Sequence, residues 1–146
     1  MTSRSLSAGW IIMLVPNLAI LLFGLSFVFV PEAMNSYGFE LFTGLSWSTF
    51  VGTKTADLLL LTSGFMFGIN ILVVTVLSTA ITLMSFRKGA RWSWYALLVG
   101  WTLGMGANIA AVSIMGAVPL AIISVVMLSL VYIALGITAK TILVKK

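Results

Sequence analysis

The chain has 146 residues, of which 61% are hydrophobic and 8% are charged. Soluble domains carry about 25% charged residues, so this chain cannot cover a water-exposed surface with polar side chains and is expected to be an integral membrane protein. It contains no cysteine and no histidine, which excludes disulfides, thiolate chemistry and iron–sulfur sites and removes the usual haem and copper ligand.

The formal net charge is +5, a value that alone would be compatible with nucleic-acid binding. A nucleic-acid binder, however, needs a basic face that follows the phosphates. The eight basic residues of this chain stand mostly at the ends of apolar runs, which is typical of membrane topology signals. No nucleic-acid partner is expected.

The first apolar run predicts a membrane-spanning helix over residues 9–30, with Trp10 at its interfacial end. The run is longer than the core of a signal peptide, which spans about 7–15 residues. Pro16 lies inside it and should remove a backbone hydrogen bond and bend the helix. A neighbouring group can bind the freed carbonyl, and Asn17 is a candidate for local or interhelical hydrogen bonding.

Residues 31–57 predict one long outer loop that lies in the membrane interface and contains one short amphipathic helix. Pro31 and Glu32 favour the start of that helix, and Gly38 should close it. The loop segment also contains all three acidic residues of the chain, which are Glu32, Glu40 and Asp57.

Three further apolar segments predict membrane-spanning helices, at residues 58–85, 92–115 and 119–140. A break at residues 116–119 separates the last two. Between the second and third spans lies a basic turn, residues 85–95, in which cations and amphipathic rings suit the membrane surface. Its interface anchors are Arg87, Lys88, Arg91, Trp92 and Trp94. The predicted fold is all-α, a four-helix transmembrane bundle that forms a single domain over residues 1–146.

The charges also predict an orientation. Arg4, the basic turn and the three C-terminal lysines fall on one side of a four-crossing chain, whereas the acidic residues and Lys54 fall on the other. Because cationic segments stay in the cytoplasm, both termini are expected to be cytoplasmic.

Two glycine pairs have the small-xxx-small spacing that lets helix backbones approach closely in lipid. Packing within the chain is the favoured interpretation of both pairs, and a dimerisation face is the alternative. The candidate packing residues are Gly64, Gly68, Gly100 and Gly104.

Three asparagines within the first three spans form a candidate polar cluster: Asn17, Asn70 and Asn108. The favoured interpretation is hydrogen bonding that joins helices. The alternative is a site for a lipid headgroup or a small ligand. The candidate hydroxyl partners are Ser63, Thr75, Thr102, Ser113 and Ser124.

Catalytic motifs are absent from the sequence, which has no Gly-rich phosphate loop, no HExxH and no GxSxG. No acidic residue falls in the middle of a span, where a proton-coupled transporter needs one. Asp57 comes nearest and is expected to be a capping charge at the N-terminus of the second span, where the helix dipole favours a negative charge. We expect no catalytic residue and no metal site.

Two stretches resemble those of small bacterial four-helix membrane proteins of the DoxX-like class: FVPEAM at residues 29–34 and FRKGARWSW at residues 86–94. The resemblance extends to the length and helix number of most of the chain, and it implies the cytoplasmic membrane of a prokaryote. Some members of that class are associated as small subunits with membrane redox complexes or quinone-linked oxidoreductases. No catalytic residue is carried over, because neither stretch is a catalytic motif.

These observations favour a non-catalytic accessory subunit that packs against a larger membrane complex and contacts lipids or hydrophobic cofactors. The expected partners are membrane lipids and other membrane protein subunits or a second copy of the chain. No cofactor of its own is expected, although a bound lipid or a hydrophobic cofactor shared with a partner is compatible with the sequence. The alternatives are a small transporter or hydrophobic-ligand-binding protein that uses the asparagines, and an interfacial lipid-modifying enzyme that uses the loop acids.

Overall fold

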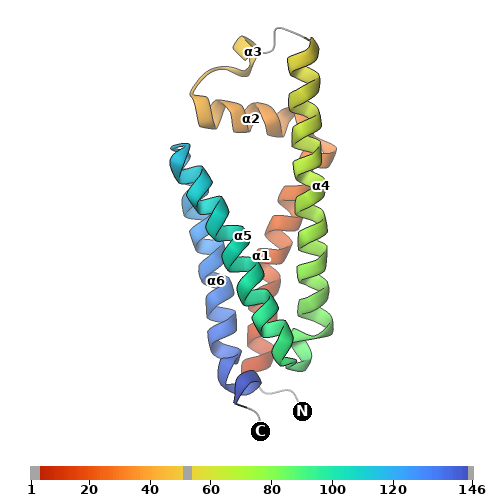
Figure 1. Cartoon of the computed structure of the whole chain (residues 1–146), viewed down its shortest axis with the longest axis vertical. Helices are drawn as coiled ribbons and strands as arrows, with labels where there is room; N and C mark the ends of the chain where they lie inside the picture. Colours follow the sequence, from red (N-terminus) through yellow and green to blue (C-terminus); the bar gives the residue numbers. More distant parts are fainter. Residues whose placement is uncertain (1–3, 51–53, 145–146) are drawn as a thin grey trace. The chain divides into compact units, whose positions relative to one another are not determined.

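A computed structural model describes residues 4–50 and 54–144, and every regular element within them is a helix (Figure 1). Four of the helices are long and apolar enough to cross a membrane. They are α1 (Arg4–Phe29), α4 (Lys54–Met84), α5 (Arg91–Ile114) and α6 (Val118–Leu143). The prediction of an all-α, four-span membrane protein is therefore confirmed, although α1 and α4 begin earlier than predicted and α6 ends later.

The segment between the first two spans contains two helices rather than one, α2 (Pro31–Thr43) and α3 (Trp47–Phe50). Pro31 occupies the first turn of α2, as predicted. The prediction that Gly38 closes this helix is wrong, because α2 runs through Gly38 and ends at Gly44. Gly44 has φ 69° and donates its N–H to the carbonyl oxygen of Glu40 at 2.9 Å. A glycine closes a helix where it adopts this left-handed conformation.

The chain divides into two compact units. Unit 1 comprises residues 1–18 and 76–146, and unit 2 comprises residues 19–75. α1 and α4 each contribute one part to either unit, whereas α5 and α6 belong wholly to unit 1.

In unit 1, parts of all four long helices pack together. The start of α1 lies against the end of α6, where Ser5 and Thr141 share a hydrogen bond of 2.7 Å between their hydroxyls. Trp94 on α5 donates its indole N–H to the carbonyl of Leu135 on α6 at 3.0 Å. The indole of Trp101, also on α5, donates to the Ser78 hydroxyl on α4 at 3.1 Å. Indole donors thus attach α5 to helices on both sides.

In unit 2, α1 and α4 approach closely at small residues. A Cβ on Gly68 would lie 2.7 Å from the Phe27 Cβ and 3.1 Å from the Gly24 carbonyl oxygen. Phe27 also packs edge-on against Phe67, with ring centroids 5.2 Å apart. One turn before Gly68, the Gly64 backbone lies against the carboxamide of Asn35 on α2. Glycine at these positions is what lets the helices approach.

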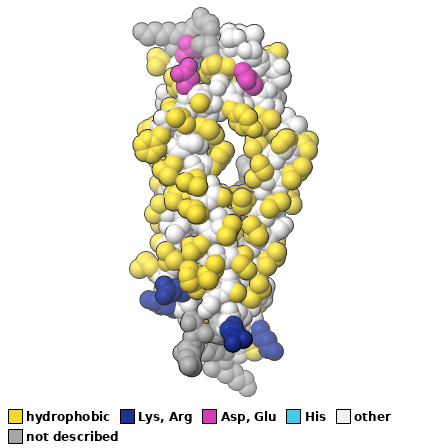
Figure 2. Space-filling view, turned by 180° about the vertical axis from the view of Figure 1, so that it is seen from behind, with side chains coloured by type: hydrophobic (Ala, Val, Ile, Leu, Met, Phe, Trp, Pro, Cys, Tyr) yellow, Lys and Arg dark blue, Asp and Glu magenta, His cyan; other side chains and the backbone are white. Residues whose placement is uncertain are grey.

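The basic turn folds as the 3-10 helix η1 (Phe86–Lys88), followed by Gly89 with φ 78°. Phe86 is completely buried, whereas Arg87 and Lys88 are exposed. In Figure 2 the basic side chains of unit 1 gather at the end that carries η1, beside a surface rich in hydrophobic side chains. The turn therefore anchors itself through an apolar residue and presents its charges outward.

Candidate functional site

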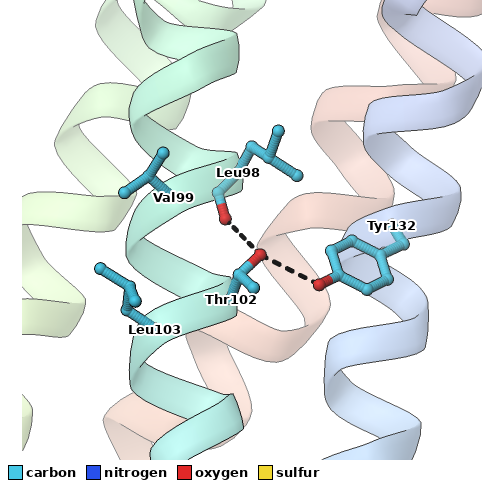
Figure 3. A pocket seen from close by; sticks show the side chains of 5 residues that line it. All are labelled: Leu98, Val99, Thr102, Leu103 and Tyr132. Carbon is cyan, nitrogen blue, oxygen red and sulfur yellow. Dashed lines mark hydrogen bonds between the residues drawn. The ribbon is translucent and has the colours of Figure 1, made fainter.

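A shallow groove of about 400 Å³ opens on the surface of unit 1 along α5, with one side chain of α6 at its edge (Figure 3). Its lining is mostly aliphatic, and the polar atoms come from one threonine and one tyrosine. The lining residues are Leu98, Val99, Thr102, Leu103 and Tyr132. Val99 and Leu103 are 54% and 68% exposed, so in a membrane the groove faces lipid. Its shape and composition suit an acyl chain or another apolar molecule rather than a charged substrate.

The two hydroxyls of the groove are hydrogen-bonded to each other. Thr102 Oγ1 lies 2.6 Å from the Leu98 carbonyl oxygen and 3.0 Å from the Tyr132 hydroxyl oxygen. If Thr102 donates its proton to the carbonyl, Tyr132 donates to Thr102 (Figure 3). Both protons are then used within the protein, and the tyrosine oxygen presents lone pairs to the groove. The pair joins the helices and leaves only an acceptor for a guest.

Tyr132→Phe should weaken the attachment of α5 to α6 only slightly. Interhelical hydrogen bonds in membranes contribute about 0.6 kcal/mol on average, so we expect a loss of about that size. A double-mutant cycle with Thr102→Val measures it, because the second substitution should cost little once the tyrosine hydroxyl is gone. Fully additive losses would show that the two hydroxyls do not interact.

The three predicted asparagines have separate partners. Asn17 is buried in unit 1, where its amide nitrogen donates to the Met13 carbonyl at 2.9 Å and lies 3.5 Å from the Thr82 hydroxyl. Asn108 donates to the Ser124 hydroxyl on α6 at 2.8 Å, one of the partners proposed from the sequence. Asn70, in unit 2, is exposed and donates to the Met66 carbonyl of its own helix at 2.8 Å. No hydrogen bond joins these asparagines to one another among the described residues, and the ligand-site alternative stays a prediction.

The two glycine pairs lie in different surroundings. Gly64 and Gly68 are buried in unit 2 against α2 and α1. Gly100 and Gly104 are exposed on α5 in unit 1, and a Cβ at either position would meet nothing within 4 Å. The same sequence spacing thus accompanies a packed helix face in one unit and an open one in the other.

The loop acids do not form a metal-binding group within residues 4–50 and 54–144. Glu32 and Glu40 are exposed. One carboxylate oxygen of Glu40 accepts the backbone N–H of Trp47 at 3.0 Å, so this residue joins α2 to the start of α3. Asp57 lies inside the first turn of α4, which begins at Lys54, so it is not the capping residue that precedes the helix. In the first turn the helix dipole favours a negative charge.

The predicted interface anchors take several roles in unit 1. The Arg87 guanidinium lies over the ring of Trp10, 5.2 Å from its centroid. Arg91 donates Nε–H to the Ile142 carbonyl at 3.3 Å, close to the end of α6. Trp92 is 57% exposed, as suits an interfacial ring, whereas Trp94 is half-buried through its bond to α6. Lys88 is exposed.

Sequence reasoning missed several polar residues that join helices, and Trp101 and Tyr132 are the aromatic ones. In the sequence, each of these two residues resembles any lipid-facing aromatic residue. Only the rotation of its helix brings its polar atom to a hydroxyl on a neighbouring helix. The preference of indole and phenol groups in apolar surroundings for a hydrogen-bond partner is the one signal that could have identified them.

Comparison with protein-family models, with curated proteins and with solved structures found no match for this chain. The four long apolar helices make it a small four-span integral membrane protein. The resemblance to the DoxX-like class stays a prediction.

Proposed function

We propose that this chain is a non-catalytic accessory subunit of the cytoplasmic membrane of a prokaryote, with both termini in the cytoplasm. It packs the exposed face of α5 against a transmembrane helix of another membrane protein and holds an apolar molecule, such as a lipid chain, in the adjacent groove. The DoxX-like resemblance agrees with this role, since some members of that class are small subunits of membrane complexes.

The observation that carries the proposal is the open small-residue face of α5. Four small residues on one side of α5 are exposed: Gly100, Gly104, Ala107 and Ala111. They are separated by four, three and four positions, the alternation found where one helix packs along another. Small residues at such a seam let two helix backbones approach closely, which is the main source of helix association in lipid. Because unit 1 leaves this face uncovered, the face is available to another helix.

The groove supports the lipid-contact part of the proposal. It adjoins the same face, since Val99 and Leu103 are neighbours of Gly100 and Gly104 along α5. A partner helix seated on the glycines would cover one side of the groove and enclose what lies in it. Partner and apolar guest would then bind next to each other.

Gly104→Leu tests the proposal. A leucine there meets no atom of the chain within 4 Å of its Cβ, so the fold should be kept while the seam is blocked. We expect proteins that co-purify with the wild type in mild detergent to be reduced at least tenfold in the variant, as measured by quantitative mass spectrometry.

Gly136→Leu is the matched control. Gly136 lies on α6, is exposed, and also has nothing within 4 Å of an added Cβ. The control should retain the co-purifying proteins. Equal retention by both variants, or a wild type that purifies as a monomer with no co-purifying protein, would contradict the accessory role. If the wild type crosslinks only to itself, the proposed partner protein is contradicted, and the helix that packs on α5 belongs to a second copy of the chain.

A further inference from the structure

The side chain of Asn17 lies in the core of unit 1 and is only 1% exposed. Its amide nitrogen donates to the Met13 carbonyl oxygen at 2.9 Å and lies 3.5 Å from Thr82 Oγ1. The carbonyl oxygen of the same side chain, Oδ1, is buried and has no hydrogen-bond partner in the part of the chain that the structure describes. One end of the carboxamide is therefore bound and the other is not.

Rotating the carboxamide by 180° would not give Oδ1 a hydrogen-bond donor. The Thr82 hydroxyl already donates its proton to the Ser78 carbonyl at 2.8 Å, so towards Asn17 it can only accept. The Met13 carbonyl likewise only accepts. A flipped side chain would place Oδ1 against two acceptors, and the orientation with Nδ2 towards Met13 and Thr82 is the one that the surroundings require.

The next hydroxyl of the network does not supply the missing donor. Ser78 Oγ lies one turn before Thr82 on α4 and accepts the indole N–H of Trp101 at 3.1 Å, and it makes no hydrogen bond to Asn17 Oδ1 among the described residues. A buried carbonyl oxygen without a donor loses the hydrogen bonds that it made in water, which is costly in a protein interior. Oδ1 of Asn17 therefore needs a donor that residues 4–50 and 54–144 do not supply.

The residue before Asn17 creates a second need at the same turn. Pro16 is fully buried inside α1 and has no N–H, so the Ile12 carbonyl loses its usual helical donor. In membrane helices, ordered water is one of the groups that bind a carbonyl freed by proline. This turn of α1 thus carries a carbonyl without its helical donor and, on the residue after Pro16, the unpartnered Oδ1 of Asn17. Water is the smallest molecule that offers two protons.

We propose that unit 1 contains an internal water site at Asn17. The bound water donates one proton to Oδ1 of Asn17 and the other to the Ile12 carbonyl oxygen. Asn17 is seven residues beyond Trp10, so at the rise of an α-helix the site lies about 10 Å along α1 from the interfacial tryptophan. The water completes the hydrogen bonding of the proline break and stays with the folded protein, independently of any partner or lipid.

A structure of the full chain in lipid nanodiscs, at a resolution that shows other buried waters, tests the proposal. We expect density for a water within hydrogen-bond distance of Asn17 Oδ1 in the wild type. An empty site at that resolution overturns the proposal. So does a rotated carboxamide whose oxygen binds a group of the protein.

Infrared spectroscopy gives an independent readout. The chain has asparagines at positions 17, 35, 70 and 108. With all side-chain carbonyls labelled with ¹³C, the difference spectrum between wild type and Asn17→Leu isolates the band of Asn17. We expect that band at the lower frequency of a hydrogen-bonded carbonyl, and a band at the frequency of a free carbonyl overturns the proposal. Asn70→Leu is the control for labelling and folding, since Asn70 is exposed on α4.

Discussion

Replacing Gly9 with alanine should destabilise the protein by about 1–3 kcal/mol, the usual cost of adding a methylene to a well-packed core. Gly9 is buried where α1 meets α6. Its added Cβ would overlap Thr138 Cγ2 and lie 3.1 Å from the backbone oxygen of Ala134. The expected result is a lower midpoint in reversible unfolding of the detergent-solubilised protein, followed by circular dichroism.

Thr138 cannot easily move aside. It is fully buried, and its hydroxyl lies 2.9 Å and 3.0 Å from the carbonyl oxygens of Ala134 and Leu135. A rotation that removed its methyl group from Gly9 would also displace this hydroxyl. The strain must therefore separate α1 from α6 or distort their ends, which are also joined by the bond between Ser5 and Thr141.

Gly136→Ala is the control for Gly9→Ala, because the substitution is identical and Gly136 has open space around it. Alanine is favoured over glycine in a helix by about 1 kcal/mol, so the control should be neutral or slightly stabilising. Equal behaviour of the two variants would show that α1 and α6 are not as close as the structure places them.

Moving the positive charges should change the orientation of the chain in the membrane. Changing Arg87, Lys88 and Arg91 to glutamine removes the basic turn. Adding lysines in the segment between the first two spans, at the exposed positions Thr43, Ser46 and Ser48, places charge on the opposite side. Because cationic segments are retained in the cytoplasm, we expect the wild type to have one orientation and the combined variant to be inverted in most molecules.

The absence of native cysteine makes this measurement direct. Single cysteines replace Leu45, after the first span, and Val144, after the last; both positions are more than half exposed. A membrane-impermeant maleimide applied to intact cells should label position 45 and not position 144 in the wild type, and the reverse in the combined variant. The outer lysines alone serve as the control and should give a mixture. Labelling of position 144 in the wild type would show that the C-terminus is not cytoplasmic.

The loop between the first two spans shows where local sequence signals succeed and where they fail. Pro31 at a helix start is a local signal, since its missing N–H costs nothing there, and α2 begins at this residue. Gly38 and Gly44 are both plausible helix ends by residue type. Their conformation decides between them, and only Gly44 has positive φ. The sequence therefore predicted the start of α2 correctly and its end incorrectly.

The amino-acid sequence was sufficient to predict the membrane class, the number of spans and the separation of basic from acidic segments. These properties depend on the length of apolar runs and on the charges at their ends, and both are local. The basic turn between the second and third spans was predicted from such local signals, and the structure has the short helix η1 at that place.

Which small and polar residues meet could be seen only in the folded chain. Gly64 and Gly68 have the same spacing as Gly100 and Gly104, yet the first pair is packed and the second is open. Asn17 and Asn108 are both asparagines of membrane spans, yet one is buried and the other exposed. These contacts differ because they depend on how each helix is rotated about its axis. In lipid, close packing rather than hydrophobicity sets that rotation. Because these helices are apolar on every side, the pattern of hydrophobic residues does not show which face of a helix is packed.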